Sequence, residues 1–241
     1  LVENAERRPA PADPWQDFMS RPADYFAMLQ ELGFLTEDDA VVEGGLPEDV
    51  IEAVRQFELD TEYLNASLRG HQSFGARFAI VQRKVIIGDE MGLGKTIEAL
   101  AVLTHLYAKG AQHSLVVCPA AVVTNWMREV HSKSALQAHR LHGLGRDTAL
   151  HSWLLQGGVA VTTYESLGWL SPLIRDVEEL ACVVLDEAHY IKNPEAKRSQ
   201  RSASIIDQAH RAILLTGTPL ENRVEEFRNL LGYVRPDLVV D

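Results

Sequence analysis

The feature that most constrains the fold is a succession of short, β-branched apolar runs that begins near residue 80. The runs cover residues 84–87, 115–118, 159–162, 182–185 and 212–216. Longer stretches with helical periodicity lie between or after them, at 95–109, 121–131, 195–208 and 223–231. Uninterrupted apolar runs of this length, separated by helices, are typical of strands that are buried on both faces of a parallel sheet. We therefore expect an α/β domain with a central, mostly parallel sheet flanked by helices.

The segment before this domain differs in charge and in periodicity. Residues 1–67 hold 16 acidic and 4 basic side chains, and the whole chain of 241 residues has a net charge of −11. Apolar side chains recur at helical spacing over 22–33 and 47–58. We predict an acidic, mainly helical segment over 1–67 and an α/β lobe over 68–241. Because the lobe is nearly neutral and a phosphate backbone responds to local potential, charge neither supports nor excludes nucleic acid.

Composition and cysteine usage narrow the cellular setting. No apolar run approaches the roughly 18 residues of a transmembrane helix, and nothing reads as a secretion signal. Cys118 and Cys182 each lie inside an apolar run, which favours buried thiols over a disulfide framework or a metal site. We expect a protein without a membrane partner that works inside the cell, in a bacterial cytoplasm or nucleoid or in a eukaryotic nucleus. The chain begins with Leu1, which indicates a trimmed piece.

A glycine-rich stretch, GDEMGLGKT at 88–96, follows the first predicted strand and precedes a long predicted helix. Phosphate-binding loops lie at this position in α/β folds, because N–H groups at a helix N-terminus can surround phosphate oxygens. Gly92 and Gly94 permit the turn, Lys95 can reach the β- and γ-phosphates, and the Thr96 hydroxyl can bind magnesium. The usual pattern has glycine where this chain has Asp89. A glycine-rich turn with a surface lysine is the alternative interpretation.

Two adjacent carboxylates, Asp186 and Glu187, follow the predicted strand at 182–185. In an open α/β sheet the ligand crevice lies at the carboxyl ends of the strands, so this pair should emerge at the same edge as the phosphate loop. We expect Asp186 to hold magnesium through water and Glu187 to orient or deprotonate the attacking water. The alternative is that the pair only caps the following segment. His189 either couples this site to the rest of the protein or is a hydrogen-bonded polar residue.

Five segments in order give the chain a family resemblance. They are GDEMGLGKT (88–96), VVCPAAVVTNW (116–126), TTYE (162–165), LDEAHYIKN (185–193) and LLTGTPLEN (214–222). Together they resemble the helicase-type motifs of Swi/Snf-related ATPases over about residues 68–235. The resemblance implies a RecA-like P-loop fold that forms the first lobe of a two-lobed, DNA-dependent ATPase using ATP and magnesium. It also implies movement along double-stranded DNA through backbone contacts with little sequence preference.

The resemblance also assigns roles to matching positions. Gln72 stands where such proteins recognise adenine, with Arg69 near the nucleotide pocket, although Gly70 and His71 replace the commoner proline and aromatic residue. The implied nucleotide contacts in the phosphate loop are Asp89, Glu90, Met91, Gly92, Leu93, Gly94, Lys95 and Thr96. The positions implied to couple phosphate release to lobe movement are Thr216, Gly217 and Thr218. The segments after Pro119 and around 162–164 match positions along the DNA track.

Several of the residues singled out in the sequence have a second interpretation. Gln72 by itself fits an exposed glutamine, and Trp126 fits a packing residue better than a base-stacking platform. A basic cluster fits a solvated helix face as well as a phosphate contact, and it consists of Lys192, Lys197, Arg198 and Arg201.

The resemblance implies partners for this chain and leaves several activities as alternatives. The family's second lobe supplies arginine fingers and does not fit in these 241 residues, so we expect the chain alone to hydrolyse ATP slowly. The expected partners are that second lobe, double-stranded DNA, and a protein that docks the acidic segment. The alternatives are a strand-separating helicase, a restriction or phage-defence motor, and a nucleotide-binding scaffold without catalysis.

Overall fold

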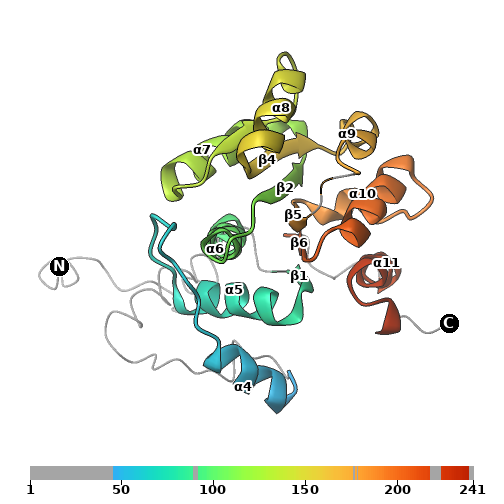
Figure 1. Cartoon of the computed structure of the whole chain (residues 1–241). Coiled ribbons are helices and arrows are strands. Elements are labelled where there is room, and N and C mark those ends of the chain that lie inside the picture. The colour runs from blue at the N-terminus through green and yellow to red at the C-terminus, as the bar shows by residue number, and fades with distance from the viewer. Residues whose placement is uncertain (1–45, 89–91, 176, 178, 218–223, 239–241) are drawn as a thin grey trace, which may run out of the picture. The chain divides into compact units, whose positions relative to one another are not determined.

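The computed structural model describes residues 46–88, 92–175, 177, 179–217 and 224–238. The helix expected over 22–33 lies outside these residues. Within the described residues, six strands form one sheet in the order β1-β6-β5-β2-β4-β3, and each neighbouring pair is parallel (Figure 1). The strands are β1 (Lys84–Ile87), β2 (His113–Cys118), β3 (Ala138–Arg140), β4 (Gly158–Thr163), β5 (Leu180–Leu185) and β6 (Ala212–Leu215).

The expected α/β fold with a parallel sheet is confirmed. Five strands correspond to the five apolar runs, and β1 has the predicted bounds. The sequence pattern misses β3, because a strand of three residues that includes His139 and Arg140 carries no apolar run.

Helices flank the sheet and connect its strands. The α-helices are α4 (Glu48–Gln56), α5 (Gly70–Gln82), α6 (Lys95–Ala108), α7 (Val123–Lys133), α8 (Arg146–Gln156), α9 (Leu167–Leu173), α10 (Lys197–Gln208) and α11 (Val224–Val234). Short 3-10 helices are η2 (Ala120–Val122), η3 (Ala188–Ile191) and η5 (Pro236–Leu238). The sequence pattern misses α5, α8 and α9, since glycine or proline at or inside these helices favours loops. Among the described helices, none combines the length and apolar character of a membrane span.

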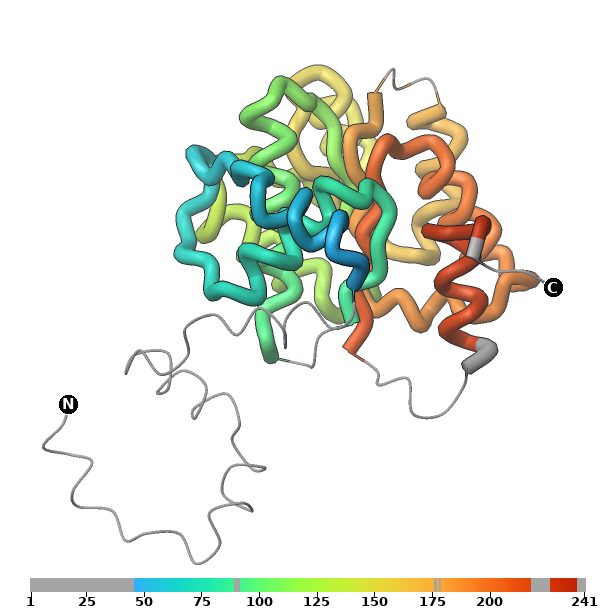
Figure 2. Tube along the Cα trace, turned by 90° about the horizontal axis from the view of Figure 1, so that it is seen from below, coloured from blue at the N-terminus to red at the C-terminus, as the bar shows by residue number. Residues whose placement is uncertain are grey.

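Both faces of the sheet are covered, because successive strand residues point to opposite sides. Along β2, Val116 and Cys118 belong to the core formed with α5, α6 and α7, whereas Leu115 and Val117 belong to the core formed with α8 to α11. Figure 2 shows the blue-to-green segments on one side and the orange and red helices on the other. Both faces of the sheet are therefore buried over nearly all of β2, β4, β5 and β6, which explains the continuous apolar runs of these strands.

Residues 46–67 belong to the same compact unit as the sheet, which covers Leu46–Asp241. Val54 in α4 is fully buried, and Leu64 forms an antiparallel bridge with Ser134 after α7. In addition, Asn65 N donates to Lys133 O at 2.8 Å. The boundary expected at residue 67 falls inside this packed unit, because helical periodicity shows that a helix has an apolar face but not which surface covers it.

Candidate nucleotide-binding site

Four segments meet at one edge of the sheet because all the strands run in the same direction. The strands β1, β6, β5 and β2 lead at this edge into Gly88, Thr216, Asp186 and Pro119. The parallel ladder continues just past the strands, since Thr216 N donates to Ile87 O at 3.0 Å and Asp186 N donates to Val117 O at 2.8 Å. The edge therefore carries both predicted halves of the site, which is where α/β folds place their ligands.

The described part of the phosphate loop has the geometry that an anion site needs. Gly92 and Gly94 have φ values of +93° and +92°, a left-handed conformation that favours glycine. Lys95 and Thr96 are the first two residues of α6. The N–H groups and the dipole at this helix end favour a phosphate group. Asp89, Glu90 and Met91 lie outside the described residues.

Gln72 connects α5 to the phosphate loop. Its Nε2 donates to Leu93 O at 2.8 Å, and its Oε1 accepts a hydrogen bond from Arg69 N at 2.9 Å. His71 Nε2 also lies 3.2 Å from Leu93 O. The interpretation of Gln72 as an exposed glutamine is wrong, because only 5% of the residue is exposed. Its contact with adenine, and the position of Arg69 near the nucleotide, stay predictions.

The two carboxylates lie at the carboxyl end of β5, as predicted. Asp186 Oδ1 accepts a hydrogen bond from Glu187 N at 2.9 Å. Glu187 has a φ of +52°, which is uncommon for a residue with a side chain and turns the backbone sharply into η3. Glu187 Oε2 lies 3.3 Å from His189 Nδ1, and both side chains are more than a third exposed. The Glu187 carboxylate is therefore accessible to a ligand and has a polar neighbour.

Two buried aromatic side chains hold Asp186 from other elements. Trp126 in α7 is 1% exposed, so the expected packing role is confirmed, and its Nε1 also donates to Asp186 Oδ2 at 2.7 Å. Tyr164, directly after β4, donates from its hydroxyl to Asp186 O at 2.7 Å. Sequence reasoning missed both hydrogen bonds, because the partners are far apart in the chain and only the sheet order brings them together.

Burial sets the protonation of the groups around Asp186. It raises the pKa of the Cys118 thiol to about 12, and the Asp186 charge adds to the shift. The same two causes, in the same order, raise the pKa of Tyr164 well above its usual value. Burial also raises the pKa of Cys182 to about 12. Both cysteines are free and buried, as expected, and Tyr164 keeps the hydroxyl proton that it donates.

The structure describes only some of the remaining predicted positions. Thr216 and Gly217 follow β6 at the same edge of the sheet, and Thr218 lies outside the described residues. In the basic cluster, Lys192 Nζ lies 2.9 Å from Glu226 Oε1, and the Arg198 guanidinium lies 5.6 Å from the Tyr190 ring centroid. These contacts join η3 to α10 and α11, so at least two members of the cluster have a structural role.

The donor set at this edge fits a magnesium ion that is bound together with a nucleotide. The candidate protein ligands are oxygen atoms, the Thr96 hydroxyl and the Asp186 carboxylate, which is the chemistry that magnesium prefers. Among the described residues, no group of three or more histidine, cysteine, aspartate or glutamate side chains could hold a metal alone. Magnesium usually keeps several waters and shares its ligands with phosphate groups, so a sparse protein set is appropriate.

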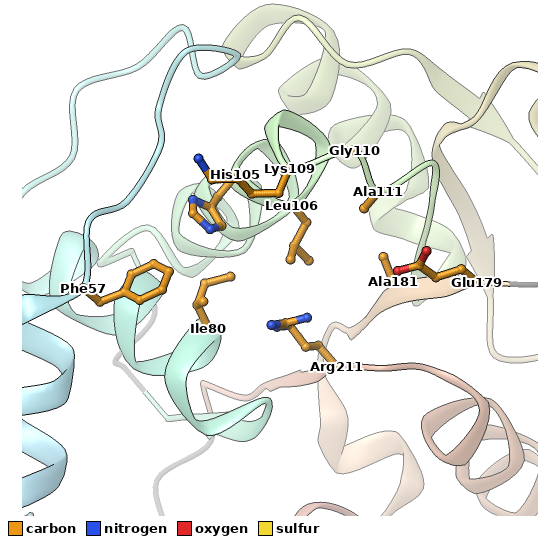
Figure 3. A pocket seen from close by; sticks show the side chains of 10 residues that line it. All are labelled: Phe57, Ile80, His105, Leu106, Lys109, Gly110, Ala111, Glu179, Ala181 and Arg211. Carbon is orange, nitrogen blue, oxygen red and sulfur yellow. The ribbon is translucent and has the colours of Figure 1, made fainter.

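A cavity of about 310 Å³ lies at the opposite edge of the sheet (Figure 3). Lys109 and Gly110 line it after the end of α6, Ala181 lies at the start of β5, and Arg211 immediately precedes β6. Figure 3 shows the Arg211 side chain directed into the space between them. Because the amino-terminal ends of parallel strands face away from their carboxyl ends, this cavity is separate from the candidate nucleotide site.

Comparison with known families decides the assignment. Residues 51–241 match the model of the SNF2-related domain. The chain belongs to the SNF2-related family. This SNF2-related lobe is also similar to a solved structure, the Sulfolobus solfataricus SWI2/SNF2 ATPase core in complex with double-stranded DNA, with 28% identity and a TM-score of 0.62. That similarity covers 75% of this chain and 38% of the solved chain, and it confirms the expected RecA-like fold.

Curated relatives of the SNF2-related lobe are much longer proteins. Chromodomain-helicase-DNA-binding protein 8 from Danio rerio is 32% identical over 211 residues, which are 79% of this chain. The human protein of the same name is 34% identical over 205 residues, or 76% of this chain. In each case the chain spans about 8% of the relative's length.

Proposed function

We propose that this chain is the ATP-binding lobe of a DNA-dependent ATPase that moves along double-stranded DNA and displaces or remodels protein–DNA complexes. The observation that carries the proposal is the position of the Asp186–Glu187 pair. It follows β5 at the same sheet edge as the phosphate loop of β1, with only β6 between the two strands. A phosphate loop and a carboxylate pair at one edge are the parts that ATP hydrolysis needs.

The chemistry divides among named side chains. Lys95 binds the β- and γ-phosphates, and Thr96 and Asp186 hold the magnesium ion, which neutralises charge on the phosphates when bound. Glu187 orients the attacking water and takes its proton. His189, 3.3 Å from Glu187, helps to set the direction of that carboxylate. Gln72, with Arg69 beside it, holds adenine while fixing Leu93 of the phosphate loop.

The proposed DNA path runs over the segments after β2 and β4, at the same edge of the sheet. The solved relative from Sulfolobus solfataricus is a SWI2/SNF2 ATPase core with double-stranded DNA, which supports this partner. Contacts to phosphates imply little sequence preference and strong salt dependence. Thr216, Gly217 and Thr218 would link phosphate release to movement of a second lobe, and the acidic N-terminal segment would dock a protein partner inside the cell.

The test is steady-state ATP hydrolysis by the full-length protein without nucleic acid and with duplex DNA, single-stranded DNA or RNA. We expect duplex DNA to stimulate most. Glu187→Gln should lower the stimulated rate by about 10²–10⁴-fold, because the general base is lost, while nucleotide binding persists. Glu195→Gln is the matched control, since this exposed residue lies nearby in the segment after η3.

Two results would contradict the proposal. Preferential stimulation by RNA or single strands would favour a strand-separating helicase. A Glu187→Gln protein as active as the Glu195→Gln control would remove the catalytic assignment.

A further inference from the structure

The magnesium-site aspartate is held by residues that come from two separate connections of the sheet. Trp126 lies in α7, which follows β2, and donates to Asp186 Oδ2 at 2.7 Å. Glu187 N already occupies one site on Oδ1 at 2.9 Å. A carboxylate has about four lone-pair sites, so both oxygens are fixed in direction while sites remain for water on a metal.

The second contact fixes the backbone of the same residue. Tyr164 follows β4, is fully buried, and donates to Asp186 O at 2.7 Å. Its ring stacks on Tyr190 of η3 with a centroid distance of 5.4 Å and an interplanar angle of 12°. Tyr190 N in turn donates to Glu187 O at 2.9 Å. Tyr164 therefore binds the Asp186 carbonyl directly and reaches the Glu187 carbonyl through Tyr190, so the two contacts flank Glu187 with its unusual φ.

These two contacts start in the two segments proposed to lie along DNA, and they end on one residue. We propose that Trp126 and Tyr164 are positioning residues that couple duplex DNA to the magnesium site through Asp186. The inference rests on the proposed function. A shift of either segment when DNA binds changes the direction of the Asp186 carboxylate or the backbone that leads to Glu187. Trp126 is 1% and Tyr164 0% exposed, and because close-packed protein interiors transmit strain, such a shift is transmitted rather than absorbed.

The proposed coupling can be measured as a change in binding affinity, because the binding of DNA and the binding of magnesium–nucleotide are thermodynamically linked. If DNA tightens magnesium–nucleotide binding by some factor, magnesium–nucleotide must tighten DNA binding by the same factor. Removing a hydrogen bond that orients a metal-binding carboxylate typically weakens metal affinity by about 10–100-fold. If Trp126 or Tyr164 had a purely structural role, its substitution would change the stability of the protein but not its magnesium affinity or the effect of DNA on nucleotide binding.

The experiment uses the full-length protein and a fluorescent, non-hydrolysable ATP analogue. Two quantities are measured: the magnesium concentration that gives half-maximal analogue binding without DNA, and the factor by which a saturating duplex tightens that binding. Trp126→Phe and Tyr164→Phe each keep a buried ring and remove the donor to Asp186. We expect each variant to raise the half-saturating magnesium concentration by about 10-fold or more and to lower the DNA factor towards one.

Trp153→Phe is the matched control. Trp153 is also fully buried, and its Nε1 donates to Gly158 O at 3.1 Å, so the same chemical change occurs away from Asp186. We expect native magnesium and DNA responses from it. Thermal melts establish whether each variant is folded. Because Tyr164→Phe removes only one oxygen, it still tests the inference if Trp126→Phe does not fold.

Four outcomes would overturn the inference. Native values of both quantities in a folded Trp126→Phe or Tyr164→Phe protein would remove the role of that residue. An equal loss in Trp153→Phe would indicate general damage to the core. If the native protein shows DNA-dependent nucleotide binding and both variants retain it, this inference alone fails. If the native protein shows no such dependence, the inference fails, and the proposed function is decided separately by whether duplex DNA stimulates ATP hydrolysis.

Discussion

Gly94 is the residue at which the backbone conformation and the surrounding contacts constrain the phosphate loop most strongly. Its φ of +92° lies in the left-handed region, and a Cβ placed there would collide with the Gln72 side-chain amide. That amide donates to Leu93 O at 2.8 Å, so it cannot move without releasing the loop. Glycine at this position is therefore required both by the turn and by the close approach of α5.

We predict that Gly94→Ala lowers the free energy of unfolding and weakens nucleotide binding. The left-handed conformation alone costs a residue with a Cβ about 1–2 kcal/mol, and displacement of Gln72 adds to that cost. Chemical denaturation and titration with a fluorescent ATP analogue measure the two effects. Gly88→Ala is the control, because no atom lies within 4 Å of its added Cβ and its φ is not in the left-handed region. Equal stability of the two variants would contradict the prediction.

At the scale of elements, α6 connects the candidate nucleotide site to residues 57–64. Its first residues follow the phosphate loop, whereas His105 near its other end accepts a hydrogen bond from Asp60 N at 2.9 Å. Lys109 Nζ lies 3.0 Å from Asp60 Oδ2, and the Phe57 ring meets the His105 ring edge to face at 5.2 Å. Because His105 Nδ1 is the acceptor, the folded protein requires a neutral imidazole at this position.

This contact predicts a stability that falls as the solution becomes acidic. Burial lowers the pKa of His105 below its usual value of 6.5, and the positive charges of Lys109 and Arg211 lower it further against the opposing effect of Asp60. Below about pH 6.5 the unfolded chain therefore binds a proton that the folded chain does not, so the free energy of unfolding decreases by up to about 1.4 kcal/mol per pH unit. Above that pH the contribution is fully present.

Denaturant unfolding between pH 7.5 and 5 (roughly the range in which histidine titrates) measures the slope. We expect His105→Asn to have a shallower slope, since the amide oxygen can accept from Asp60 N and does not titrate. Some slope should remain, because burial also lowers the pKa of His139. A His105→Asn protein with the native slope would show that His105 does not titrate as inferred.

At the scale of the whole molecule, the compact unit begins at Leu46, before the α/β pattern starts. In the segment that follows α4, Leu64 is buried in the core that contains α5 and α6, and Phe57 and Leu59 pack against that core. Tyr63 stacks edge to face on Tyr107 of α6 at 5.0 Å, and Ala135 N donates to Tyr63 O at 2.9 Å. The early segment thus covers the helix that begins at the phosphate loop.

Two truncations test this arrangement. Removal of residues 1–45 keeps the compact unit Leu46–Asp241 whole and serves as the reference. Removal of residues 1–67 exposes the surface that Val54 and Leu64 cover, and each buried aliphatic side chain contributes about 1.5–3 kcal/mol. The shorter protein should therefore lose much of the about 5–15 kcal/mol that stabilises a typical domain. Circular dichroism melts measure both, and similar melting temperatures for the two truncations would contradict the packing described.

The sequence by itself determined five of the six described strands, the parallel sheet and the two halves of the candidate nucleotide site. It did so because buried parallel strands leave continuous apolar runs, and because the phosphate loop and the Asp186–Glu187 pair are local patterns at strand ends. Such signals lie within a few neighbouring residues, so they can be read without knowing the neighbours in space.

Only the tertiary structure decided which distant residues support that site. Gln72 meets Leu93, and Trp126 and Tyr164 meet Asp186, only after the strand order is formed. The short edge strand β3 and the cover provided by residues 46–67 also depend on packing between elements. Hydrogen bonds and contacts across a sheet depend on spatial order, and that order is a property of the whole core rather than of any local run of sequence.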